Sequence, residues 1–215
     1  MIRGYALVLT LLVLAAALFT GWYGSTRAEY FPTSLMRQQL ICPPGSDVDS
    51  ISVLDQFEVD WYSEELRSLE EPSLYRPAAK SAPRHVETVR FTWIRSFHDP
   101  VVIRIDSYPD GATWLTAKRR AIGWVPAPTW ERRLTRQLRP QEVERFKRLL
   151  SSSRVLDQPS VDCRVGLDGA RWIVEAARPR EDYTYINRFS PESGPVHRLG
   201  LELISLTGWK FDRVY

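Results

Sequence analysis

Residues 86–107 read VETVRFTWIRSFHDPVVIRIDS, and this stretch decides the fold class. In its first half Val89, Phe91 and Trp93 alternate with Arg90 and Thr92. In its second half Val101, Ile103 and Ile105 alternate with Val102, Arg104 and Asp106. A period of two is typical of a β-strand that buries one face and exposes the other. We therefore predict two half-buried strands, over residues 86–95 and 101–107.

A turn signal follows directly at Pro109-Asp110-Gly111. Proline presets φ for the turn and glycine accepts a positive φ, so the chain should return as a hairpin partner. The same alternation continues further along the chain, after polar or glycine-rich turns. The further strands predicted in this way cover residues 112–119, 130–138, 170–178 and 183–189.

Three other stretches carry the spacing of three and four that is typical of an amphipathic helix. They begin near residues 55, 140 and 195, and Gly208 is a plausible stop for the last of them. Strands and helices are segregated along the chain rather than alternating. This order predicts an α+β domain with an antiparallel sheet of five or six strands and two or three packed helices.

The chain begins with an apolar segment. Residues 5–19 contain no charge, and with the next five they form a run long enough to cross a hydrocarbon core of about 30 Å. Arg3 precedes this run, which favours a cytoplasmic N-terminus and a domain on the far side of the membrane. An uncleaved single-pass anchor over residues 1–24 is the first interpretation, and a cleaved secretory signal is the second. Both predict a periplasmic or secreted location.

Residues 25–54 contain several prolines and an acidic cluster, which break regular structure. We interpret them as a spacer with a short helical piece around residues 35–41. The remaining chain, 55–215, is long enough for one domain with its own core. Its predicted helix over residues 55–70 has an apolar stripe, made of Phe57, Trp61, Tyr62, Leu66 and Leu69.

Charge and composition exclude several classes of partner. A formal net charge of +3 over 55 charged side chains is close to balanced and gives no case for a nucleic-acid partner. The three histidines have no second ligand at a metal-binding spacing, so no metal site or other cofactor is predicted.

Cys42 and Cys163 have two interpretations. In an oxidising compartment they could form a disulfide, which would close a loop of about 120 residues. Alternatively, one or both are small buried hydrophobic residues, since Cys42 lies in a proline-rich stretch outside the predicted core.

Candidates for catalysis are weak. His98 lies beside Asp99 between two predicted strands, where a carboxylate could orient it as a general base. Asp168 and Glu175 lie near strand ends and turns and could meet as an acid–base pair. The alternatives are a histidine that caps a corner and aspartates that serve the backbone of their turns.

Aromatic residues suggest a binding surface instead. Trp172, Tyr183 and Tyr185 lie on two strands predicted to pair, with Arg171 and Arg188 nearby. Exposed aromatics with arginine could stack on a glycan or on a partner protein. The alternative is that these residues belong to the core.

Four short motifs resemble those of a group of bacterial exported or envelope proteins that has no assigned activity. The likeness runs from about residue 57 to 208 and implies an origin in the bacterial envelope, without a mechanism or site residues. The motifs are Trp61-Tyr62-Ser63, Glu71-Pro72-Ser73-Leu74, Gly166-Leu167-Asp168-Gly169-Ala170 and Phe189-Ser190-Pro191.

These observations favour a noncatalytic envelope protein. It would contact the membrane through residues 5–24, and its domain would bind a protein or cell-wall glycan partner. The alternative is a hydrolase or glycan-modifying enzyme that uses His98 or a carboxylate pair. An inhibitor or immunity-type module is a third hypothesis.

Overall fold

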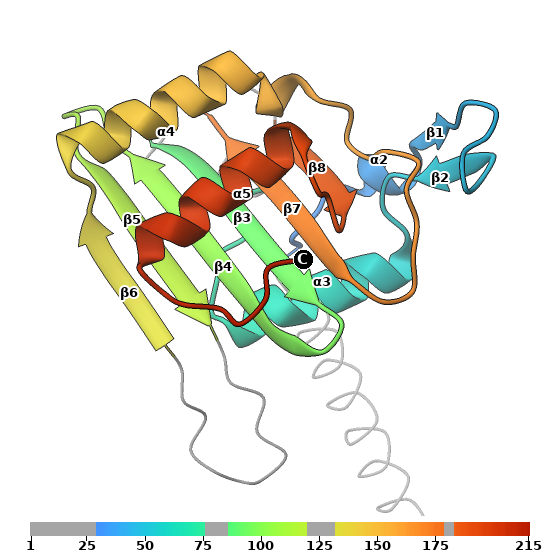
Figure 1. Ribbon diagram of the computed structural model, residues 1–215, viewed down its shortest axis with the longest axis horizontal. Coiled ribbons are helices and arrows are strands. Elements are labelled where there is room, and N and C mark those ends of the chain that lie inside the picture. The colour runs from blue at the N-terminus through green and yellow to red at the C-terminus, as the bar shows by residue number, and fades with distance from the viewer. Residues whose placement is uncertain (1–28, 76–85, 120–131, 179–182) are drawn as a thin grey trace, which may run out of the picture.

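The computed structural model describes residues 29–75, 86–119, 132–178 and 183–215. At its centre lies a six-stranded antiparallel sheet in the order β6-β5-β4-β3-β7-β8 (Figure 1). The predicted α+β class and strand number are confirmed. The strands are β3 (Glu87–Arg95), β4 (His98–Ser107), β5 (Thr113–Arg119), β6 (Arg132–Gln137), β7 (Ala170–Ala177) and β8 (Thr184–Phe189).

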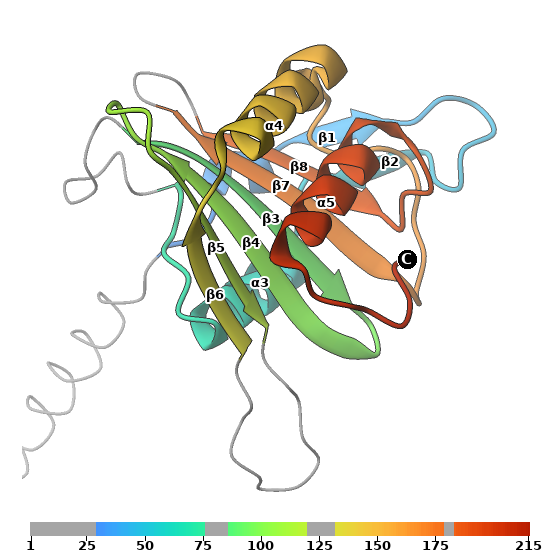
Figure 2. The ribbon, with the colours of Figure 1, turned by 60° about the vertical axis from the view of Figure 1, so that its left-hand side comes forward.

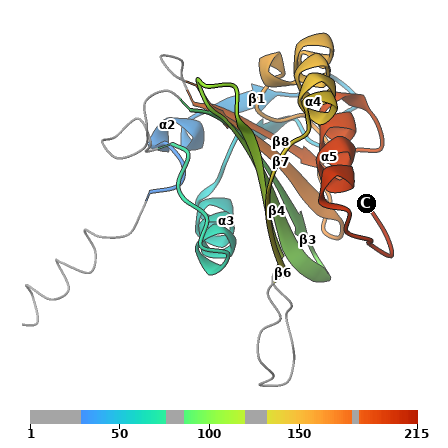
Figure 3. The same cartoon turned by 90° about the vertical axis from the view of Figure 1, so that its left-hand side faces the viewer.

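Helices cover both faces of this sheet. The described residues contain four α-helices rather than the two or three predicted: α2 (Thr33–Met36), α3 (Gln56–Ser68), α4 (Pro140–Ser153) and α5 (Gly194–Thr207). Seen edge-on, α4 and α5 lie on one side of the sheet, and α2 and α3 on the other (Figure 3). A small hairpin of β1 (Gln39–Ile41) and β2 (Ser50–Ser52) stands near the β8 edge (Figure 2).

Local sequence fixes where the helices begin and end. Asp55 caps α3, because its side chain accepts a hydrogen bond from the backbone amide of Glu58 at 2.8 Å. In turn, the Glu58 carboxylate accepts a hydrogen bond from the backbone amide of Asp55 at 3.4 Å. This reciprocal arrangement satisfies two amides that otherwise lack partners. Pro140 starts α4 and Gly208, at φ 67°, ends α5. Glycine is suited to this left-handed conformation because it has no Cβ.

The two-sided cover corrects the prediction of half-buried strands. The polar residues of β3 that alternate with its apolar ones, Thr88, Arg90 and Thr92, are buried as well. The reason is that α3 and the segment before it pack on the face that alternation alone assigns to solvent. The sheet is therefore the middle of three layers.

Residues 29–54 differ from the predicted spacer. Tyr30, Phe31, Leu35 and Leu54 are buried in the core layer between the sheet and α3. The helical piece predicted over 35–41 is also wrong, because a single helical turn ends at Met36 and the chain then extends into β1.

The apolar stripe of α3 is confirmed in its second half only. Tyr62, Leu66 and Leu69 are buried, whereas Phe57 is 70% exposed. Phe57 instead lies beside Trp61, with ring centroids 5.8 Å apart.

The predicted anchor or signal, residues 1–24, lies outside the described residues. Within the described part of the chain, none of the helices has the length and apolarity that crossing a membrane requires.

The C-terminal segment returns across the layer that contains α5. Buried Trp93 and Trp172 both donate from Nε1 to the backbone oxygen of Tyr215, at 3.1 and 2.9 Å. This oxygen satisfies two indole groups that the packing has removed from water, as buried donors require.

Candidate functional site

The residues predicted for catalysis do not meet. Glu175 pairs with Arg90 in the middle of β3, whereas His98 lies opposite Arg95 at the end of that strand. Five strand positions separate Arg90 from Arg95, which corresponds to about 16 Å. Asp168 lies exposed in the loop before β7.

His98 has a structural contact of its own. Its Nδ1 lies 2.7 Å from the hydroxyl of Tyr215, and the two rings meet edge to face. The histidine thereby helps to hold the C-terminal segment on the sheet.

Glu175 belongs to a buried cluster of charges under the segment that follows α3. Arg90 contacts both of its carboxylate oxygens at 2.8 Å, and Tyr183 donates to it at 2.6 Å. Next to them, Glu71 pairs with Arg104 at 2.7 Å and with Lys118 at 2.8 Å. Acids and bases pair within the cluster, which ties residues 69–72 to the sheet. This arrangement favours a structural role for Glu175 over a catalytic one.

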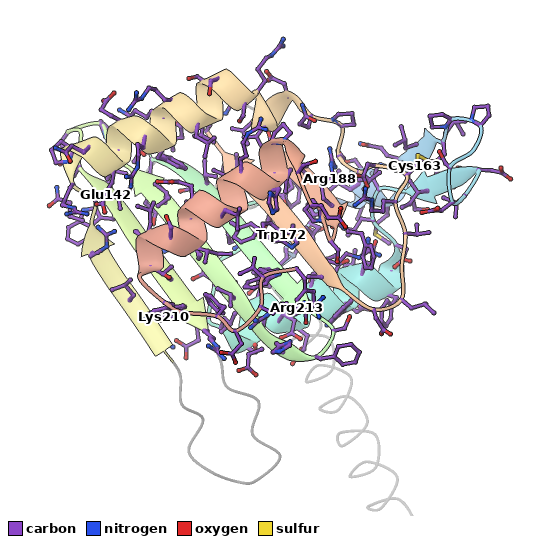
Figure 4. The ribbon with its side chains drawn as sticks, in the orientation of Figure 1. Glu142, Cys163, Trp172, Arg188, Lys210 and Arg213 are labelled. Carbon is purple, nitrogen blue, oxygen red and sulfur yellow. A yellow bond between two sulfur atoms is a disulfide. The ribbon has the colours of Figure 1, made fainter. Side chains whose placement is uncertain are left out.

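The predicted aromatic binding residues are part of the core. Trp172 is buried beneath α5 (Figure 4), whereas Tyr185 is buried on the opposite face of the sheet, against α3. Tyr183 is half-buried beside Glu175. Arg188 is buried and donates to the backbone oxygen of Pro159. These side chains therefore do not form one exposed stacking surface.

Cys42 and Cys163 form a disulfide, with Cα atoms 5.7 Å apart. It joins the β1–β2 hairpin to the loop that precedes β7, at the end of the molecule where Figure 4 labels Cys163. Of the two interpretations of these cysteines, the structure confirms the first, a disulfide.

A polar pocket of about 270 Å³ lies between the two segments that this disulfide joins. Three groups of residues line it. The hairpin side supplies Ser50, Ile51, Ser52 and Val53, the start of α3 supplies Asp55 and Glu58, and the remaining walls are Val161, Val165, Arg171 and Asn187.

Glu58 is held in place at this pocket by three groups. Tyr62 donates to its Oε1 at 2.8 Å, Arg171 Nη2 lies 3.4 Å from the same oxygen, and the capping box holds Oε2. Burial raises the pKa of Tyr62, and the negative charge of Glu58 raises it further. The phenol therefore stays protonated, so it acts here as a hydrogen-bond donor rather than as a base.

Asn187 lies at the inner wall and is the unusual residue of the site. It is 3% exposed, and its backbone amide donates to Ser160 at 2.7 Å. Its side chain lies within hydrogen-bonding reach of the hydroxyls of Tyr62 and Tyr185. Its Oδ1 and the Tyr185 hydroxyl are both shielded from solvent and have no other hydrogen-bond partner among the described residues. The Tyr185 hydroxyl is a donor that can satisfy this oxygen, so Asn187 belongs to the buried wall of the pocket rather than to its accessible face.

Sequence reasoning missed both Glu58 and Asn187 as site residues. A usable signal existed for Asn187, because it shares one face of its strand with Tyr183, Tyr185 and Phe189. An amide among aromatic residues indicates a polar group inside the core. No such signal existed for Glu58, whose position also suits an ordinary helix cap.

Other parts of the described chain are weaker candidates for a ligand site. A hollow of about 350 Å³ between α4 and the sheet has an apolar floor of Val89, Ile105 and Phe146. Arg154 lines it as well, but is already paired with Asp157 at 3.0 Å. No group of three or more metal-binding side chains occurs in the ranges that the structure describes.

Comparisons with known proteins do not add to this picture. No family model matches the chain, and no significant match to a curated protein is found. The candidate site therefore depends on its geometry, and the resemblance to bacterial envelope proteins stays a prediction.

Proposed function

We propose that this protein is a noncatalytic binding domain on the extracytoplasmic side of a bacterial membrane, and that its ligand site is the polar pocket between the β1–β2 hairpin and the loop before β7. The observation that carries the proposal is the polar pocket of about 270 Å³ between the β1–β2 hairpin, the start of α3 and the loop before β7, two of whose walls the disulfide joins. Ligand sites combine a concave shape with a few convergent polar groups, and this pocket has both.

The disulfide supports the proposed compartment. Disulfides persist in oxidising environments such as the periplasm and are rare in the cytosol. The apolar segment of residues 5–19 points to the same location, either as an anchor or as a cleaved signal. An alkaline phosphatase fusion after about residue 40 should be active, and an inactive fusion would contradict the proposed location.

The arrangement of the predicted catalytic residues favours binding over hydrolysis. Glu175 is neutralised by Arg90 in a fully buried pair, and His98 is hydrogen-bonded to Tyr215. A general acid and base must reach the same substrate atom or its neighbours. These two residues lie too far apart for that role.

The pocket also suits a cell-wall partner, since solubilised wall fragments carry hydroxyl, amide and ammonium groups that can hydrogen-bond to its polar lining. Isothermal titration of the full-length protein in detergent with such fragments should show binding. Replacing Ser52 by Ala removes a partly exposed hydroxyl from the lining and should weaken binding by up to about tenfold, because one hydrogen bond contributes about 0.5–1.5 kcal/mol.

Ser107→Ala is a suitable control, because Ser107 lines the separate hollow beside α4. This variant should bind as the wild type does. The absence of binding at millimolar fragment concentration, or equal binding by the Ser52→Ala variant, would overturn the proposal.

A further inference from the structure

Two exposed apolar side chains lie at one end of the central sheet. Phe97, in the turn between β3 and β4, is 72% exposed, and Leu167, in the loop before β7, is 98% exposed. Hydrogen bonds join the two loops, because the Ser96 amide donates to the Gly169 carbonyl at 3.0 Å and the Gly169 amide donates to Oγ of Ser96 at 3.1 Å. Figures 1 and 2 show the loops side by side. We call Phe97 and Leu167 the paired loop tips.

Exposed arginines lie next to the paired loop tips. Arg164 belongs to the loop before β7, and Arg213 stacks over the ring of Tyr215, 5.5 Å from its centroid. Tyr215 in turn contacts His98, the residue that follows the β3–β4 turn. Neither arginine has a carboxylate partner within the part of the chain that the structure describes. Their charges are therefore open to a ligand outside the domain.

A second pair of arginines adds positive charge at the same end. Arg95 and Arg119 both stack on the ring of Phe211, 5.4 and 5.5 Å from its centroid. Burial, together with the nearby charge of Arg119, lowers the pKa of Arg95 to about 10. Asp99 lies 3.7 Å from Arg119, so its carboxylate balances one of the two charges. The group as a whole keeps a net positive charge.

The composition of this end suits the surface of a lipid bilayer. Its charged side chains give a net charge of +2. They are Arg95, Arg119, Arg164, Lys210 and Arg213 on the positive side and Asp99, Asp168 and Asp212 on the negative side. Arginine binds the phosphates that lipid headgroups carry, and apolar side chains beside it enter the boundary between headgroups and acyl chains.

The predicted anchor would bring a membrane within reach of this end. Residues 25–28 separate the apolar run from Glu29, and they allow a span of at most about 17 Å. The Glu29 carbonyl accepts a hydrogen bond from Ser73, and the carbonyl just before Ser73 accepts one from Arg90 in the middle of β3. The end of β3 at Arg95 lies about 16 Å along the strand from there.

Other surfaces near the anchor suit a membrane less well. At the opposite end of the sheet, the β4–β5 turn carries Asp110, and Tyr108 beside it is only 41% exposed. The outer side of α3 exposes Phe57, but Asp60 and Glu64 are exposed on the same helix. Carboxylates at these places would be repelled by lipid phosphates.

We propose that this end of the sheet docks onto the lipid bilayer, with Phe97 and Leu167 in the interfacial layer and the neighbouring arginines against lipid phosphates. The inference goes beyond the proposed ligand pocket and rests only on the membrane location in the proposed function. Docking of this kind would fix the orientation of the domain on the membrane, in addition to the anchor.

A fluorescent label at position 167 tests the docking. Both native cysteines are in the disulfide, so Leu167→Cys adds one free thiol, to which an apolar, environment-sensitive fluorophore is attached. The full-length protein is placed in nanodiscs of phosphatidylethanolamine and phosphatidylglycerol with a nitroxide near the headgroups. The reference label is at Glu144→Cys, which is exposed on α4 (Figure 1). The first label should be quenched at least about threefold more strongly, because only an inserted side chain reaches the nitroxide layer.

Phe97→Asp is the informative variant, because it puts a charge on the other loop tip. In the protein labelled at position 167, it should lower the quenching at least about twofold, since a charged side chain is costly to insert. Ile41→Asp is the matched control, because Ile41 is 75% exposed on β1, away from this end (Figure 2). This change should leave the quenching as it is. Far-UV circular dichroism should be the same for both variants, since both positions are exposed.

Equal quenching at positions 167 and 144 would overturn the inference and would leave this end of the sheet to a protein partner. Unchanged quenching in the Phe97→Asp variant would overturn it as well. These results are independent of the ligand pocket. If cell-wall fragments bind while the label at position 167 is not quenched, the docking is wrong and the binding function stands. If the label is quenched and no fragment binds, the pocket is wrong and the docking stands.

Discussion

The buried pair of Arg90 and Glu175 allows a prediction whose size follows from the structure. Both side chains are fully buried, and two hydrogen bonds of 2.8 Å join them. Replacing Glu175 by Gln keeps the shape but leaves the arginine charge without its main partner. Breaking a buried ion pair in this way costs about 3–5 kcal/mol.

The lower end of that range is expected here. A second carboxylate, Glu71, lies 3.9 Å from Nη1 of Arg90 and compensates part of the charge. Glu71 is already shared with Arg104 and Lys118, so it cannot replace Glu175 in full. We expect the Glu175→Gln variant to lose about 3 kcal/mol of unfolding free energy, a large part of the 5–15 kcal/mol typical of a domain.

Urea unfolding of the full-length protein in detergent, followed by far-UV circular dichroism, measures this loss. Glu202→Gln is the control, because Glu202 pairs with Arg145 in a pair that is partly exposed on both sides. This change should cost less than about 1 kcal/mol. The double variant Arg90→Met with Glu175→Leu should be more stable than Glu175→Gln, since it buries no unpaired charge.

Two results would refute this reasoning. One is a Glu175→Gln variant whose unfolding free energy lies within 1 kcal/mol of the wild type, as estimated for an exposed pair. The other is a double variant less stable than the single one, which would mean that the pair contributes net stability beyond the cost of an unpaired charge.

Three further predictions concern other parts of the molecule. Replacing Cys42 and Cys163 by serine opens a loop of 121 residues and should lower the free energy of unfolding by at most about 5 kcal/mol, as measured by urea unfolding, whereas a wild type insensitive to reductant would contradict this. Hydrogen bonds from Arg136 and Arg139 hold the pKa of Glu142 well below its usual range. These hydrogen bonds therefore contribute fully to the free energy of unfolding above the ordinary glutamate pKa of about 4.3, and this contribution is lost as the pH falls towards the lower pKa of the folded state. The Glu142→Gln change should accordingly destabilise the protein at pH 7 and much less at pH 2. Removing Tyr215 takes the acceptor from two buried indole groups and should cost about 1–3 kcal/mol for each, visible as a lower midpoint of thermal unfolding, and an unchanged midpoint would show that these hydrogen bonds are dispensable.

Much of the secondary structure could be predicted from the sequence. The alternation in β3 and β4, the turn at Pro109-Asp110-Gly111 and the helix that begins at Pro140 are all local signals. Each depends on residues within a few positions of one another, which is why the pattern alone locates the element.

The candidate site could not be predicted in the same way. Glu58 and Asn187 are 129 positions apart in the chain, and their shared pocket exists because α3 packs across the strand that carries Asn187. The binding surface predicted from Trp172 and Tyr185 failed for a related reason. These residues sit on opposite faces of the sheet, and helices cover both faces.

The sequence by itself determined the element types, the antiparallel hairpins and the α+β class, because these follow from the periodicity of side chains and from turn chemistry. Only the tertiary structure decided that the sheet is covered on both sides, that Cys42 meets Cys163 and that Arg90 meets Glu175. The partners in those pairs are 121 and 85 residues apart, and sheet order and helix packing bring them together. Periodicity reports which residues share a face, but what covers that face depends on chain segments that no local pattern identifies.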